Sequence, residues 1–218
     1  TVRVRDAFGN GVAGALVGLS LVGSGTLTGG TATASDGNGL ATFASLSVDL
    51  AGSKQLTAAS GALAPVSSSA FAVTAGAAAA LAFEQQPGAT VAGAMITPAV
   101  TVRVRDAFGN AVAGAPVALS LAGTGSLGGS TLVASDSSGL ASFTTLNVDQ
   151  AGLKNLVASS GENVAVLSDP FTVIAGAAAA LAFEQQPSAT VAGATITPAV
   201  KVRVNDAFGN AVAGAPVT

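Results

Sequence analysis

A ten-residue sequence at the start of the chain returns twice, each time 100 residues later. Residues 1–10 and 101–110 both read TVRVRDAFGN, and residues 201–210 read KVRVNDAFGN. Aligned at this offset, roughly two-thirds of the positions match, which is typical of tandem copies of one unit. Repeats of about 20 to 50 residues build solenoids with one shared core, but a unit of this length is long enough to bury its own core. The sequence therefore predicts a row of domains.

Apolar and polar residues alternate along most of each copy, as they do in half-buried β-strands. The pattern is clearest where Val100, Val102 and Val104 alternate with Thr101 and Arg103. Turn sequences rich in Gly, Asn, Asp and Ser separate the alternating segments. Residues 123–129 are expected to form a loop, and strands are expected at residues 180–186, 100–104, 117–121, 131–135, 140–146, 153–159 and 164–173.

About seven short strands per copy, each followed by a turn signal, predict an all-β fold made of antiparallel sandwiches. The alternative at residues 175–183 (AGAAAALAF) is a short helix, because alanine is the best helix former. A helix of this length is marginal in isolation, and the segment continues into LAFEQQP, which has the pattern of a strand.

The domain boundaries are expected near residues 75–80 and 175–180. Residues 1–74 then form a repeat that lacks its first strand, residues 75–174 a complete repeat, and residues 175–218 the first strands of a third. Neither incomplete repeat has enough strands to be stable alone, because each leaves sheet edges and half a core exposed. We expect these residues to be a window on a longer chain. The alternative is that a neighbouring copy supplies the missing strand.

The composition excludes several classes of function. The chain has no His and no Cys, so the commonest general base, thiolate nucleophiles and most transition-metal ligands are missing. We expect no enzyme, no catalytic, cofactor-binding or metal-binding residues, and no cofactor. The net charge of −3 and the absence of a basic patch argue against nucleic acid as a partner. No apolar segment is long enough for insertion into a membrane.

Residues 36–39 (DGNG) resemble half of a calcium loop, with oxygen ligands at alternate positions. The matching residues 136–139 read DSSG, so a serine stands in place of the amide ligand, and no acidic residue follows at the twelfth position. An Asx turn explains both versions, because Asp starts such turns and Gly takes positive φ. We therefore expect a turn rather than a calcium site.

Asp6, Asp106 and Asp206 begin the repeated DAFGN turn. A catalytic carboxylate pair needs a second acid nearby, and the sequence supplies none, so we expect solvated turn residues. The glycine-rich residues 23–30 (GSGTLTGG) lack the lysine of a phosphate-binding loop and are not followed by a helical pattern. They are expected to form an ordinary loop.

Three longer segments and one short motif carry a resemblance to a known family. They read LAFEQQPSATVAGATITPAV at residues 181–200, VRVRDAFGNAVAGAPVALSL at 102–121, DSSGLASFTTLNVDQAG at 136–152 and PFTV at 170–173. In this order they resemble the bacterial immunoglobulin-like (Big) repeats of invasin- and intimin-type adhesins and of very long repetitive surface proteins. The resemblance covers the whole chain. It implies immunoglobulin-like sandwiches in an extracellular stalk or fibre on a bacterial cell.

The chain departs from these relatives at one position. Many relatives read AGTYTL, whereas this chain reads AGSKQL at residues 51–56 and AGLKNL at residues 151–156, which places Lys54 and Lys154 in the aromatic position. We expect each lysine to cover apolar surface with its stem and to extend its ammonium group to water. The alternative is an isopeptide crosslink to an Asn or Asp, which needs a buried, unprotonated amine beside a carboxylic acid.

The surface is expected to be rich in small, weakly solvated residues, because only 9% of the residues are charged. Such faces favour lateral packing between copies, and strand edges allow strand donation. We therefore predict a structural, non-enzymatic repeat region of a bacterial adhesin or extracellular fibre, serving as rigid spacer and self-assembling filament building block. Its partners are neighbouring copies, while host or surface ligands bind outside these residues. The alternatives are a carbohydrate- or receptor-binding module, and a spacer for a catalytic domain elsewhere.

Overall fold

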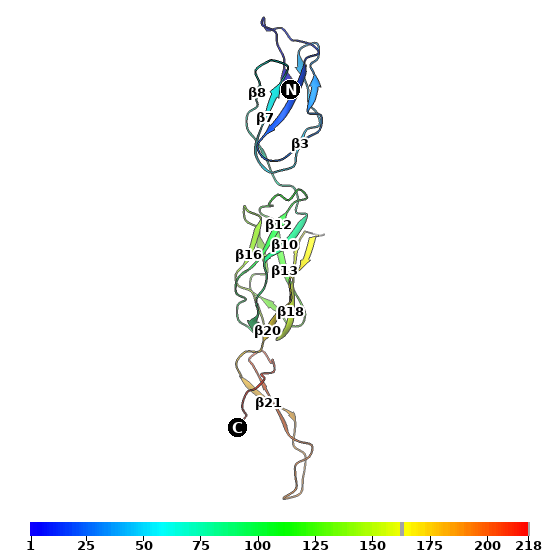
Figure 1. The fold of residues 1–218 in the computed structure, drawn as a ribbon. Helices are drawn as coiled ribbons and strands as arrows, with labels where there is room; N and C mark the ends of the chain where they lie inside the picture. Colours follow the sequence, from blue (N-terminus) through cyan, green and yellow to red (C-terminus); the bar gives the residue numbers. More distant parts are fainter. Residues whose placement is uncertain (162–163, 218) are drawn as a thin grey trace. The chain divides into compact units, whose positions relative to one another are not determined.

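The computed structural model describes residues 1–161 and 164–217, with only the backbone of Val164, and all its regular elements are β-strands (Figure 1). Among these residues no helix is long and apolar enough to cross a membrane. The chain divides into two compact units. Unit 1 comprises Thr1–Ala77 and Asp106–Asn110, and unit 2 comprises Ala78–Arg105 and Ala111–Thr218. The predicted all-β fold is confirmed.

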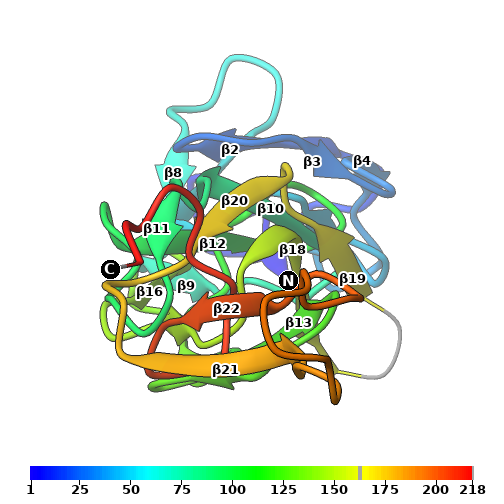
Figure 2. The ribbon, with the colours of Figure 1, turned by 90° about the horizontal axis from the view of Figure 1, so that it is seen from below.

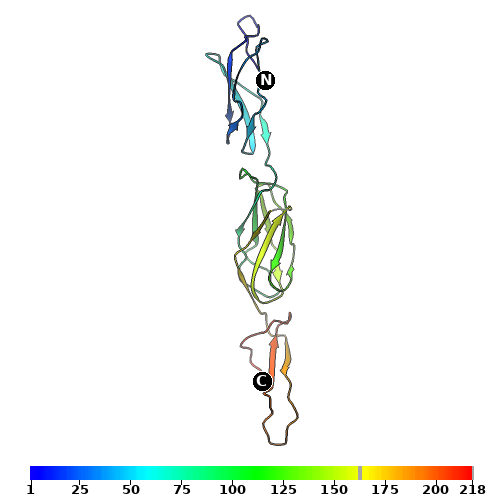
Figure 3. The same ribbon diagram turned by 90° about the vertical axis from the view of Figure 1, so that its right-hand side faces the viewer.

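Unit 2 contains two main sheets that face each other (Figure 3). The first has the order β10-β12-β16, and the second has the order β11-β20-β18-β13-β15, with β19 also paired to β18. All pairs are antiparallel except β11–β20. The bounds are β10 Ala80–Gln85, β11 Thr90–Val91, β12 Val100–Arg105, β13 Pro116–Ala122, β15 Leu132–Ala134, β16 Leu140–Phe143, β18 Gly152–Ser160, β19 Val164–Leu167 and β20 Phe171–Ile174.

Two further strand pairs lie in unit 2. One joins β14 (Leu127–Gly128) to β17 (Asn147–Val148). The other joins β21 (Ala180–Gln185) to β22 (Lys201–Asn205), which lie side by side in Figure 2. The β21–β22 pair repeats the register of β10–β12 and forms a two-stranded sheet of its own.

The core of unit 2 is built by the alternation seen in the sequence. Val100, Val102 and Val104 of β12 are fully buried, and the residues between them are not. From the opposite sheet, Val117 and Leu156 are also fully buried in the same cluster. Strand β10 closes one side of this core, because Leu81 and Phe83 pack against it.

Unit 1 has the same kinds of strand but a smaller core. Its sheets are β4-β2-β7-β8 with β9 also paired to β7, β1-β5, and β3-β6. The buried apolar residues form a cluster of Val4, Val17, Ala41 and Ala58. No strand corresponding to β10 occurs among the described residues of unit 1. The bounds are β1 Val2–Arg3, β2 Leu16–Val22, β3 Leu27–Thr28, β4 Ala32–Ala34, β5 Leu40–Ala41, β6 Ser47–Val48, β7 Gly52–Ala59, β8 Val66–Ser67 and β9 Phe71–Val73.

Several details differ from the sequence-based expectations. Residues 175–183 hold the start of strand β21 rather than a helix, because β21 gains hydrogen bonds from β22. The expected loop 123–129 contains β14, a two-residue strand whose partner β17 is distant in sequence. Residues 164–173 divide into β19 and β20, which pair with different parts of β18. The boundaries proposed for the three repeats remain predictions.

The two copies give a matched test of how much the completed core matters. Phe143 is fully buried in unit 2, whereas its counterpart Phe43 in unit 1 is only half-buried. We expect Phe143→Ala to lower the free energy of unfolding of unit 2 by about 3–5 kcal/mol, and Phe43→Ala to cost unit 1 clearly less. Calorimetry and urea unfolding followed by circular dichroism measure both. Equal costs would contradict this account of the core.

Candidate functional site

The repeated DAFGN turn is organised around one carboxylate. In the middle copy, Asp106 Oδ1 accepts hydrogen bonds from the N–H groups of Phe108 (2.9 Å) and Asn110 (2.8 Å). Its Oδ2 accepts from Asn110 Nδ2 (2.8 Å) and from the N–H of Gly76 (2.9 Å). Gly109 completes the turn at a φ of 85°, which a residue with a Cβ rarely adopts. The turn therefore presents the Asn110 side chain in a fixed orientation.

Asn110 uses this orientation to bind a turn of the preceding copy. Its Nδ2 donates to the carbonyl oxygen of Asp49 (2.8 Å), and its Oδ1 accepts from the N–H of Ala51 (2.9 Å). Both partners belong with Asn110 to unit 1. We call this pair of hydrogen bonds the asparagine clamp. It contacts only backbone atoms of its partner turn, so it does not depend on the partner's side chains.

The asparagine clamp occurs a second time, inside unit 2. Asn210 Nδ2 donates to the carbonyl oxygen of Asp149 (2.8 Å), and its Oδ1 accepts from the N–H of Ala151 (2.8 Å). Asp206 again accepts from Gly176 N–H (2.8 Å). In the first copy Asn10 donates its amide only to Asp6 (3.0 Å), and both residues are exposed. Among the described residues, the motif therefore binds a turn of another copy at Asn110 and at Asn210, whereas the Asn10 amide bonds within its own turn.

The second clamp has an additional apolar contact. The ring of Phe208 lies directly on Gly93, where an added Cβ would come within 2.4 Å of two ring carbons. The N–H of Gly93 donates to the carbonyl oxygen of Val148 (2.8 Å), next to the turn that Asn210 binds. Gly93 is therefore needed for close approach as well as for its positive φ of 78°.

The expectation that all three aspartates are solvated is wrong for two of them. Asp6 is exposed, but Asp106 and Asp206 are only 5% and 3% exposed. The Asn110 amide, with the N–H of Gly76, lowers the pKa of Asp106 to about 2. Burial acts to raise the pKa of Asp206, but the bonds from Asn210 and Gly176 outweigh it and lower this pKa to about 2.

The predicted exposure of the lysine ammonium groups is also wrong. Lys54 and Lys154 are each 2% exposed. Lys154 Nζ donates to Thr124 Oγ1 (2.9 Å) and to the carbonyl oxygen of Ala151 (3.4 Å), and Lys54 does the same with its own copy's Ser24 and Ala51. Turn residues therefore bind each ammonium group inside the protein. Among the described residues no carboxylate lies within ion-pair distance of either lysine, as a crosslink would require.

The lysines support the same turns that the asparagine clamp binds. Ala151 donates its N–H to Asn210 and accepts the Lys154 ammonium at its carbonyl oxygen. Asp149 adds a third restraint, because its Oδ1 accepts from the N–H of Ser126 (2.7 Å). Each partner turn is therefore fixed from inside its own copy before the asparagine of the next copy binds it.

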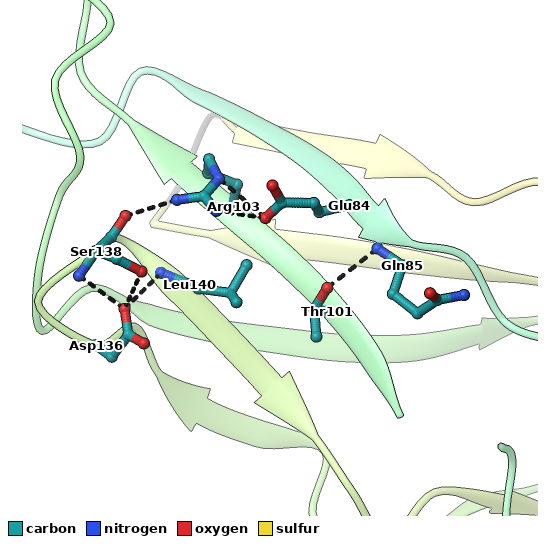
Figure 4. Close-up of polar contacts among 7 residues, drawn as sticks. All are labelled: Glu84, Gln85, Thr101, Arg103, Asp136, Ser138 and Leu140. Carbon is teal, nitrogen blue, oxygen red and sulfur yellow. Dashed lines mark hydrogen bonds and ion pairs between the residues drawn. The ribbon is translucent and has the colours of Figure 1, made fainter. Parts of the chain in front are cut away.

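The candidate calcium residues serve a turn. Asp136 Oδ1 accepts from the N–H of Ser138 (2.8 Å), its hydroxyl (2.7 Å) and the N–H of Leu140 (3.0 Å), as Figure 4 shows. These bonds, that of Leu140 above all, lower the pKa of Asp136. Asp36 accepts the matching bonds from Asn38 and Leu40. Within residues 1–161 and 164–217, no group of three acidic residues is placed to hold a metal ion.

No protein-family model matches the chain, and no curated protein matches it. Among solved structures it matches the Escherichia coli adhesin FdeC with 22% identity and a TM-score of 0.48, over 96% of this chain and 68% of that chain. It matches invasin, a bacterial integrin-binding protein, with 19% identity and a TM-score of 0.43 (97% and 43%). The D0-D1 domain of intimin matches with 19% identity and a TM-score of 0.34 (79% and 87%).

These solved structures include invasin and intimin, whose repeats the sequence was predicted to resemble. This chain spans less than half of the invasin chain that it matches.

The clamp gives a pH prediction whose sign follows from the lowered pKa values. A carboxyl group with a folded pKa near 2 and an ordinary value of 3.8 stabilises the fold fully above pH 3.8, and this stabilisation disappears as the pH falls through 2. We expect the carboxyl ¹³C resonances of Asp106 and Asp206 to titrate near pH 2. Asn110→Ala should raise the pKa of Asp106 toward 3.8 and leave Asp206, the internal control, unchanged. An unchanged Asp106 would contradict the assignment.

The buried lysines give a second prediction. Lys154→Met keeps the apolar stem but leaves the carbonyl oxygen of Ala151 and Thr124 Oγ1 without a buried donor, so we expect a loss of about 1–3 kcal/mol in the free energy of unfolding of unit 2. Thr124→Val, which removes one bond only, should cost less.

Intact-mass measurement of the unchanged chain should give the sum of its residues. A mass lower by one water or one ammonia per copy would show a crosslink.

Proposed function

We propose that this chain is a structural, non-enzymatic repeat region of a bacterial cell-surface adhesin or extracellular fibre, in which each copy is a spacer of defined length. The observation that carries the proposal is the asparagine clamp. A chain of independent sandwiches would need no hydrogen bonds between one copy and the next. Here the turns at residues 49–51 and 149–151, each held by a buried lysine, receive the asparagine of the following copy.

The chemistry of the clamp suits a repeated spacer. An amide side chain offers one donor and one acceptor, and the turn offers one carbonyl oxygen and one N–H, so both groups are satisfied at once. Because the partner atoms are backbone atoms, any copy that forms the turn can be followed by any copy that carries DAFGN. Buried backbone groups that lose such partners are costly, which favours the docked arrangement.

We also propose a location and partners for the protein. We place the repeats outside the cell, with other copies of the chain as their partners and with any host or surface ligand bound by other parts of the protein. The weakly charged surface supports contact between copies, since little hydration is lost when small side chains pack together.

Spin-label distances test whether the clamp fixes successive copies. The chain has no cysteine, so Thr42→Cys and Ser142→Cys, at exposed and equivalent positions of two copies, give clean labels. We expect a narrow distribution of label distances in the otherwise unchanged chain. Asn110→Ala removes two hydrogen bonds of about 1 kcal/mol each, so undocked copies should become roughly tenfold or more commoner and the distribution should broaden.

Asn10→Ala is the matched control for this experiment. It changes the same motif where the asparagine amide bonds to Asp6 and to no other copy among the described residues, so it should leave the distribution unchanged. A broad distribution in the chain with intact clamps would contradict the spacer proposal.

A further inference from the structure

The outer face of the second sheet of unit 2 carries no charged side chain among the described residues. Along β13 and β18 every second residue is buried in the core, so the residues between them point outward. The described strands of this sheet hold one charged residue, Lys154, whose side chain is buried. We call the outward side chains of β15, β13, β18 and β19 the uncharged face. Its centre is formed by Ala118, Ser120, Val157 and Ser159.

The other main sheet of unit 2 carries its charges on the outside. The valines of β12 are buried, so Arg103 and Arg105 between and beyond them point away from the core. Arg103 binds Glu84 of β10 through Nε (3.0 Å) and Nη2 (2.5 Å), as Figure 4 shows. Charge is therefore divided between the two sheets, and one outer face is strongly hydrated while the other is hydrated only weakly.

Unit 1 has the same uncharged face on its sheet β4-β2-β7-β8. The strands of this sheet also hold one charged residue, Lys54, which is buried like Lys154. Most outward residues differ between the two units, and Thr57, for example, stands where unit 2 has Val157. None of these differences introduces a charge. The two copies therefore share the absence of charge and not the individual side chains.

The uncharged face is low in the middle and raised at its sides. Ala118 lies opposite Leu132 on the flanking strand β15. Ser120 lies opposite Val157, which in turn lies opposite Leu167 on the other flank. Leu132 and Leu167 are 66% and 57% exposed. A partner that covers the face would remove both leucines from water, which favours contact.

The absence of charge indicates what kind of partner fits. A charged group placed against this face would lose its water and gain no counter-ion, so a charged surface is a poor partner. A second molecule of this chain offers an equally uncharged face. Contact between the two faces would desolvate no ion, and their serine hydroxyl groups can rotate to donate to or accept from one another. The face is therefore matched in charge by its own copy.

The size of the face determines how strongly it binds. Strands β15, β13, β18 and β19 hold 3, 7, 9 and 4 residues, which at ~16 Å² of sheet per residue give a face of about 370 Å². The corresponding strands of unit 1 give about 320 Å². A specific interface buries about 800 Å² on each partner, which two such faces approach and one does not. Association should therefore strengthen with each further copy that takes part.

From these observations we propose that molecules of this chain associate side by side through their uncharged faces and leave their charged faces in water. The contact uses the same surface on both partners, so it is self-complementary and joins molecules in pairs. The inference deepens the proposed function, on which it rests in taking other molecules of the chain as partners.

Sedimentation equilibrium of the full 218-residue chain over a concentration series tests the proposal. We expect the average mass to rise reversibly from monomer toward dimer. Ser120→Glu places a carboxylate at the centre of the uncharged face, where the contact would bury it without a counter-ion. The dissociation constant should therefore rise roughly tenfold or more. Ser120 is exposed, so circular dichroism should show an unchanged fold.

Ser142→Glu is the matched control. Ser142 is an exposed residue of β16, on the charged sheet, and the substitution changes the net charge by the same amount. This variant should associate like the unchanged chain, so general repulsion between molecules would not explain a loss seen only with Ser120→Glu. Adding Ser20→Glu, at the equivalent exposed position of unit 1, to Ser120→Glu should leave the chain monomeric.

Three results would overturn the proposal. They are a chain that stays monomeric throughout the series, equal effects of Ser120→Glu and Ser142→Glu, and a monomeric chain that sediments with phosphatidylcholine vesicles unless Ser120 is replaced. The last result would assign the face to a lipid surface. Spin-label distances within one molecule are measured after dilution with unlabelled chain. A narrow distribution in a monomeric chain would therefore contradict this inference and leave the spacer proposal intact.

Discussion

The Asp106 carboxylate accepts four hydrogen bonds, and much of the architecture depends on them. Three of the four come from its own turn, and they orient the Asn110 amide toward the backbone of the preceding copy. The fourth comes from Gly76, in the segment that connects the two copies. The Asp106 carboxylate therefore fixes the shape of its turn, binds the segment that connects the two copies and orients the side chain of Asn110. Its pKa of about 2 reflects all three tasks.

The first strand of each copy decides whether the core closes. In unit 2 this strand is β10, and the valines of β12 are fully buried beneath it. No such strand is among the described residues of unit 1, and there residues of identical type in equivalent positions are partly exposed. The side chains that line the two cores are largely the same. The difference in burial between the two units therefore comes from the first strand and not from the sequence of the core. Whether the core is closed therefore depends on which strands are present.

The sequence predicted the strands better than it predicted the contacts between them. The alternation of apolar and polar residues predicted β12 and β13, because the burial pattern of each strand follows from its own residues. The two-residue strands β14 and β17 were missed because they exist only as each other's partners. The turn at Asp106 was predicted, but its burial was not, since the clamp on Asp49 and Ala51 spans about 60 residues of sequence. A signal was available: DAFGN and the VD-x-AG turn recur together at a fixed spacing in the chain.

The near-identity of strands in successive copies also has a consequence for how such a protein must fold. A segment that reads ALAFEQQ fits the second strand of its own copy and of any other copy equally well, so an unfolded chain holds many competing partners of the same affinity. Misassembly between neighbouring domains is a characteristic failure of repeat proteins. Synthesis from one end avoids it, because each first strand meets its own second strand before the next copy emerges. The order of folding would then select the correct strand pairs, which the repeated sequence alone does not specify.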